Sequence, residues 1–81
     1  MRLDRYTGQE PKFKVLRRQP DGTYSEVPAF DCFVMKRQDI NTPDGLMAYA
    51  DAALRHGDQE LNADMMRLAY EWLEGPHKQP D

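Results

Sequence analysis

The sequence has a single cysteine, Cys32, among its 81 residues, and one thiol excludes an intrachain disulfide. Histidine is nearly as scarce, because His56 and His77 are the only two, so the usual four-ligand pattern of a structural zinc site is missing. The five glycines stand singly and form no phosphate-binding loop. No apolar run approaches the roughly 20 residues that cross a bilayer. These absences predict a cytoplasmic protein with no metal, no cofactor and no membrane partner.

The sequence also lacks a constellation that would indicate catalysis. A nucleophilic enzyme needs an activated Ser, Cys or Thr beside a base, and the candidate is Cys32 with His56 or His77. Cys32 lies in an apolar, strand-like pattern, where a free cysteine usually behaves as a small buried hydrophobe. The carboxylates of the second half are typical of solvated helix faces. We therefore expect no catalytic residue and a protein that is not an enzyme.

Charge is present but unevenly distributed. Residues 1–40 hold eight Lys and Arg against six Asp and Glu, a net charge of +2. Residues 41–81 hold three against eight, a net charge of −5, and the two halves together give the overall −3. A charged partner is therefore expected to contact one half only.

Residues 12–37 have the character of an antiparallel sheet. Apolar and polar side chains alternate over residues 12–18 and 23–27, which predicts two half-buried strands. Between them Pro20, Asp21 and Gly22 predict a hairpin turn, most simply a type I turn closed by a glycine bulge. Pro28 interrupts the ladder. Residues 30–35 either continue the second strand after a kink or form a third strand, and we favour a kink followed by a long strand.

Residues 43–74 have the pattern of two helices. Thr42 is expected to cap the first helix, with Pro43 in its first turn and Gly57 ending it after His56. Asp58 is expected to cap the second helix, which ends at Gly75. Each helix carries one apolar stripe at helical spacing. The stripes consist of Leu46, Tyr49, Ala50, Ala53 and Leu54 in the first helix and of Leu61, Met65, Leu68, Ala69 and Trp72 in the second.

Strands followed by helices indicate an α+β fold. We expect an antiparallel β-hairpin or a three-stranded sheet packed against a C-terminal helical hairpin. The length and the 40% hydrophobic content predict one domain over residues 1–81, with a flexible arm over residues 1–11 and a polar tail over residues 75–81.

Two groups of charged residues are candidates for partner binding. The first lies on the sheet side and the second forms an acidic strip on the second helix. The sheet-side group consists of Arg17, Arg18, Tyr24, Lys36 and Arg37, and Lys36 and Arg37 are expected on an adjacent strand. The acidic strip consists of Asp58, Glu60 and Asp64. The basic group could instead follow nucleic-acid phosphates, although lysine and arginine also commonly shield sheet edges. A homodimer built on the helical pair is a third possibility, since a chain this short buries little surface alone.

The organisation of residues 12–74 resembles small uncharacterised proteins of bacteriophages and prophages. The likeness is carried by the segments KFKVLRR, PDGTY, AFDCFVMKRQD, TPDGLMAYADAALRHG and ELNADMMRLAYEWLE. It implies an accessory protein that binds a host protein in the host cytoplasm and inhibits or redirects it, including inhibitors of CRISPR-type and other defence systems. The resemblance implies no functional residue. A small nucleic-acid-binding regulator that uses the basic hairpin is the alternative.

Overall fold

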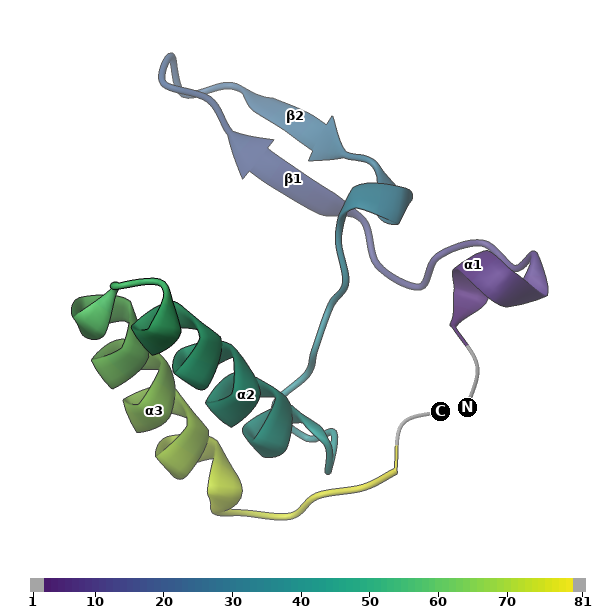
Figure 1. Ribbon diagram of the computed structural model, residues 1–81. Helices are drawn as coiled ribbons and strands as arrows, with labels where there is room; N and C mark the ends of the chain where they lie inside the picture. Colours follow the sequence, from purple (N-terminus) through teal and green to yellow (C-terminus); the bar gives the residue numbers. More distant parts are fainter. Residues whose placement is uncertain (1–2, 80–81) are drawn as a thin grey trace. The chain divides into compact units, whose positions relative to one another are not determined.

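The computed structural model describes residues 3–79. The chain divides between Val34 and Met35 into an N-terminal and a C-terminal unit. The N-terminal unit contains a single helical turn, α1 (Asp4–Thr7), followed by the strands β1 (Val15–Arg18) and β2 (Tyr24–Val27) and a short 3-10 helix, η1 (Ala29–Asp31). The C-terminal unit contains the helices α2 (Thr42–Arg55) and α3 (Gln59–Leu73) (Figure 1).

The predicted hairpin is confirmed, and its turn has the predicted form. β1 and β2 pair antiparallel, with Val15 opposite Val27 and Arg18 opposite Tyr24. The N–H of Gly22 donates to the carbonyl of Gln19 at 3.0 Å, which closes a four-residue turn. Asp21 does not have a positive φ whereas Gly22 has φ +88°, so the turn is type I and the glycine forms the bulge. Only glycine adopts that φ without steric strain.

The prediction of a long strand after Pro28 is wrong. The carbonyl of Pro28 accepts the N–H of Asp31 at 2.9 Å and thereby closes η1. This turn redirects the chain directly after β2, and the described sheet has two strands only. The thiol of Cys32 also donates to the Pro28 carbonyl, at 3.6 Å. Residues 32–36 have no regular secondary structure, so Cys32 does not lie on a strand.

The two helices meet at a corner of three residues that the sequence predicted. The N–H of Asp58 donates to the carbonyl of Ala53 at 2.9 Å, and the N–H of Gly57 donates to Leu54 at 3.0 Å. Together with φ +91° at Gly57, these bonds form a Schellman motif that ends α2. The carboxylate of Asp58 then accepts the N–H of Leu61 at 2.9 Å and caps α3, as predicted.

The start of α2 differs from the prediction that Thr42 caps it. Asn41 occupies the capping position, without a side-chain hydrogen bond, and Thr42 is the first helical residue. Thr42 is fully buried, and its hydroxyl donates to the carbonyl of Lys36 at 2.6 Å. The Thr42 hydroxyl therefore donates to a loop carbonyl instead of accepting a hydrogen bond from the N–H groups at the start of the helix.

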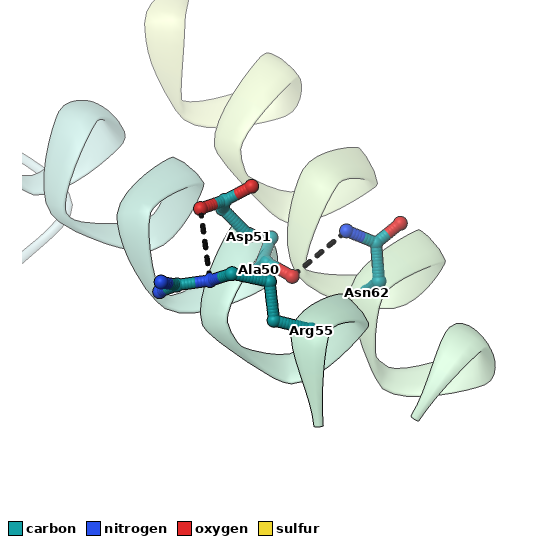
Figure 2. Close-up of polar contacts among 4 residues, drawn as sticks. All are labelled: Ala50, Asp51, Arg55 and Asn62. Atoms are coloured by element: carbon teal, nitrogen blue, oxygen red, sulfur yellow. Dashed lines mark hydrogen bonds and ion pairs between the residues drawn. The ribbon is translucent and has the colours of Figure 1, made fainter. Parts of the chain in front are cut away.

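The core of the C-terminal unit lies between α2 and α3. Leu46, Ala50 and Ala53 of α2 and Ala69 of α3 are buried. The small alanines bring the two helices close together, and the amide of Asn62 donates to the carbonyl of Ala50 across the interface at 2.8 Å (Figure 2).

The predicted stripe of α3 is confirmed, and that of α2 is confirmed in part. Leu61, Met65, Leu68 and Trp72 are half-buried beside Ala69. In α2, however, Tyr49 is 55% exposed and Leu54 48% exposed. These two residues lie at the margins of the stripe, beyond the buried positions of the same helix.

The segment after α3 returns to the loop before α2. The N–H of Lys78 donates to the carbonyl of Gln38 at 2.9 Å, and the N–H of Ile40 donates to the carbonyl of Lys78 at 3.0 Å. Nε2 of His77 lies 2.6 Å from the carbonyl of Trp72, one of the last carbonyls of α3, which have no partner within the helix. The two ends of the helical pair are therefore joined by backbone hydrogen bonds.

The α+β layout is confirmed: a two-stranded antiparallel hairpin precedes two helices that pack together. The single domain, the flexible arm and the packing of the helices on the sheet stay predictions. Residues 1–2 of the predicted arm and residues 80–81 of the predicted tail lie outside the described residues.

Candidate interaction surfaces

The register of the hairpin sorts its side chains into two faces. Directly opposed residues of antiparallel strands share a face, and neighbours along a strand alternate between faces. One face, called here the Leu16 face, consists of Leu16, Arg18, Tyr24 and Glu26. The other, the Val15 face, consists of Val15, Arg17, Ser25 and Val27.

The two faces differ in exposure. All four residues of the Leu16 face are exposed, and Leu16 and Tyr24 present 52% and 62% of their surface to solvent. On the Val15 face, Val15 and Val27 are half-buried, and the amide of Gln19 donates to the hydroxyl of Ser25. The Leu16 face therefore offers a leucine, a tyrosine and one charge of each sign to a partner.

The sheet-side candidates are not brought together as one group. Arg18 and Tyr24 are cross-strand neighbours on the Leu16 face, a position at which side chains contact each other directly. Arg17 lies on the opposite face. Within residues 3–79, neither Arg17 nor Arg18 forms an ion pair.

Lys36 and Arg37 do not lie on a strand, and that prediction is wrong. They belong to the C-terminal unit, where Lys36 precedes a turn and Arg37 is part of it. The carbonyl of Lys36 accepts the N–H of Asp39 at 3.1 Å as well as the hydroxyl of Thr42. The backbone of Lys36 thus anchors the start of α2, and both side chains are exposed.

The acidic candidates lie at the start of α3, where Asp58 is the capping residue and Glu60 and Asp64 belong to the first two turns. Asp58, Glu60 and Asp64 are all exposed, and Glu60 and Asp64 are four residues apart on one side of the helix. Asp58 differs from the other two because one of its carboxylate oxygens already accepts the N–H of Leu61. The exposed arginines of the same two helices form ion pairs within their own helices, Arg55 with Asp51 at 3.4 Å and Arg67 with Glu71 at 3.7 Å.

An open hollow of about 470 Å³ lies beside the α2–α3 corner. It is lined by Tyr49, Ala52, Ala53, His56, Asp58 and Leu61. Sequence reasoning did not single out this combination, although the spacing of Tyr49, Ala53 and His56 places them on one side of a helix. The hollow could not be predicted because it depends on how α3 leaves the corner.

Phe30 and Phe33, which the sequence pattern placed on a strand, belong to a larger group of exposed hydrophobic residues in the N-terminal unit. No residue between positions 6 and 34 is buried, and the large exposed side chains there include Tyr6, Phe13, Phe30 and Phe33. The position of Leu16 could have been found from the sequence, because alternation along a strand places it on the opposite side from Phe13 and Val15.

Within residues 3–79, no three His, Cys, Asp or Glu side chains are grouped so that they could hold a metal ion. No helix in that part of the chain is both long and apolar enough to cross a membrane.

The comparisons with known proteins identify no relative. No protein family matches the chain, and no significant match exists among curated proteins or solved structures.

Proposed function

We propose that this protein is a non-enzymatic, phage-type accessory protein that binds a host protein through the Leu16 face of its hairpin and inhibits or redirects it. The observation that carries the proposal is the exposure of Leu16 and Tyr24 on a two-stranded sheet. Two strands alone are marginally stable in water, so a hairpin with such a face gains stability when a partner covers it.

The composition of the Leu16 face supports a protein partner. Tyrosine and arginine are the residues most enriched where binding energy concentrates in protein interfaces, and Arg18 and Tyr24 stand side by side. Both strands also have an edge that is unpaired within the described sheet, so a partner strand could add to it by backbone hydrogen bonds.

The phage origin and the host target rest on the resemblance of the sequence to small phage and prophage proteins. The most specific version of this proposal is that the protein inhibits a defence system of the CRISPR type. It requires only that the protein cover a functional surface of its target in a fixed stoichiometry, without chemistry of its own.

A nucleic-acid-binding regulator is the second candidate, and the pairing of Arg18 with Tyr24 favours it. A cation beside an aromatic ring is an arrangement that single-stranded nucleic acids bind. Glu26 on the same face repels phosphate, however, and Arg17 is directed away from it. We therefore favour the protein partner.

The proposal is tested by capture from bacterial lysate with tagged full-length protein, with and without nuclease. The variant Leu16→Thr/Tyr24→Thr removes the apolar groups of the Leu16 face, and Arg17→Thr/Ser25→Thr changes the Val15 face as a matched control. Threonine favours strands, so both variants are expected to keep the hairpin.

We expect a protein that resists nuclease and binds the wild type and the Arg17→Thr/Ser25→Thr variant, but not the Leu16→Thr/Tyr24→Thr variant. Equal capture by all three proteins would show that the Leu16 face is not the binding surface. Capture that disappears with nuclease would support the nucleic-acid regulator instead.

A further inference from the structure

The hollow beside the α2–α3 corner combines an apolar floor with a polar rim. Ala53 is buried, and Ala52 and Leu61 are half-buried, so the floor consists of methyl and methylene groups. The rim consists of Tyr49, His56 and Asp58, all three of which are exposed. A ligand that fits must therefore carry a short apolar segment and a polar end.

The charge around the hollow selects a cation for that polar end. The lining contains one carboxylate, that of Asp58, and neither lysine nor arginine. Arg55, close by on α2, is already paired with Asp51 (Figure 2). Glu60 adds negative charge in the first turn of α3, and Asp58 offsets the partial positive charge of that helix end.

We propose that this hollow binds an arginine side chain presented by a partner protein. The methylene stem of an arginine packs on apolar groups such as Ala52, Ala53 and Leu61 while its charged end stays at the rim. The planar guanidinium stacks on an aromatic ring, here the exposed ring of Tyr49. Asp58 accepts one N–H of the backbone and has acceptor sites left for the guanidinium.

Arginine is favoured over lysine for geometric reasons. An ammonium group is a compact and strongly hydrated charge, and it neither stacks on a ring nor presents two parallel donors to a carboxylate. The site belongs to the helical unit and uses no residue of the Leu16 face, so it goes beyond the proposed function. Either surface can bind while the other does not.

The test is an NMR titration of the ¹⁵N-labelled full chain with the blocked tripeptide Ala-Arg-Ala. Its control is the same tripeptide with citrulline, which has the shape of arginine without the charge. We expect saturable shifts of the amides of Tyr49, His56 and Leu61, with an affinity for the citrulline peptide that is weaker by about threefold or more. Equal binding of both peptides, or no shift at millimolar concentration, would overturn the proposal.

A pair of variants separates the site from general charge attraction. Asp58→Asn removes the charge and keeps the oxygen that caps α3, so the fold is retained. Asp64→Asn removes the same charge six residues further along the chain, outside the lining of the hollow. We expect Asp58→Asn to weaken the affinity for the arginine peptide about fivefold, and Asp64→Asn to change that affinity by less than about twofold. If both variants weaken the affinity equally, the peptide is attracted by the general negative charge of α3 and does not bind in the hollow, which would overturn the proposal.

Discussion

Replacing Asn62 with aspartate tests the contact that fixes α2 against α3. The amide of Asn62 donates to the carbonyl of Ala50 at 2.8 Å in a half-buried position (Figure 2). Aspartate has the same shape and nearly the same helix propensity as asparagine, so the substitution changes the hydrogen bond and the charge but little else. An oxygen that cannot donate then faces the carbonyl oxygen.

The magnitude follows from two contributions. Loss of a neutral hydrogen bond costs about 1 kcal/mol, and placing a carboxylate against a carbonyl in a half-buried site adds about 1 kcal/mol more. We therefore expect Asn62→Asp to lower the free energy of unfolding by about 2 kcal/mol at pH 7. In a chain of this size the loss corresponds to a decrease in Tm of roughly 10 °C.

The assay is thermal unfolding followed by circular dichroism at the helix signal, with Asp64→Asn as the control. Asp64 is exposed on the same helix, and exchanging a carboxylate for an amide there is expected to change stability by no more than about 0.5 kcal/mol. If Asn62→Asp and Asp64→Asn change the Tm equally little, the hydrogen bond does not hold the two helices together and the reasoning is refuted.

Three further predictions concern the turn and the start of α2. Gly22→Ala places a Cβ at φ +88°, which costs about 1–2 kcal/mol, so the cross-strand NOEs between Arg18 and Tyr24 should weaken; unchanged NOEs would contradict the glycine bulge. Asp21 accepts two hydrogen bonds from Thr23, one from its hydroxyl and one from its N–H. Both bonds lower the pKa of the Asp21 carboxyl below its usual 3.8, and the hydroxyl has the larger effect. The resulting stabilisation of the hairpin is complete above pH 3.8 and is lost as the pH falls through the lowered pKa of Asp21. If the hairpin NOEs of a Thr23→Val variant fade at the same pH as those of the wild type, the Thr23 hydroxyl does not cause the pH dependence. Thr42→Val removes the buried hydroxyl that donates to Lys36 and should cost about 1–2 kcal/mol in thermal unfolding, whereas a Tm within error of the wild type would show that the bond contributes nothing.

The elements that could be predicted from the sequence are those that depend on local backbone preferences. The turn at Pro20–Gly22 and the corner at Gly57 and Asp58 are set by residues whose φ or capping ability acts within a few positions. These signals need no knowledge of the remainder of the chain, and the structure confirms them.

The features that could not be predicted depend on residues further apart in the sequence. The hydroxyl of Thr42 donates to the carbonyl of Lys36, six residues before it, rather than capping α2. The backbone bonds between Lys78 and residues 38–40 join segments on either side of both helices. Propensity and periodicity carry no information on such contacts.

The candidate residues illustrate the same difference within one strand. Arg17 and Arg18 belong to one basic group in the sequence. Adjacent residues of a strand face opposite sides, so the alternation alone could have separated them. That Tyr24 is the neighbour of Arg18 follows only from the register, which the turn geometry fixes.

Photocrosslinking from two adjacent positions of β2 tests the central claim most directly. A photoreactive phenylalanine analogue replaces either Tyr24, on the Leu16 face, or Ser25, on the Val15 face, in the full-length tagged protein. After irradiation in bacterial lysate treated with nuclease, the account predicts a discrete crosslinked protein from position 24 and none, or far less, from position 25. The same adduct in equal yield from both positions, or no adduct from position 24, would contradict binding through the Leu16 face.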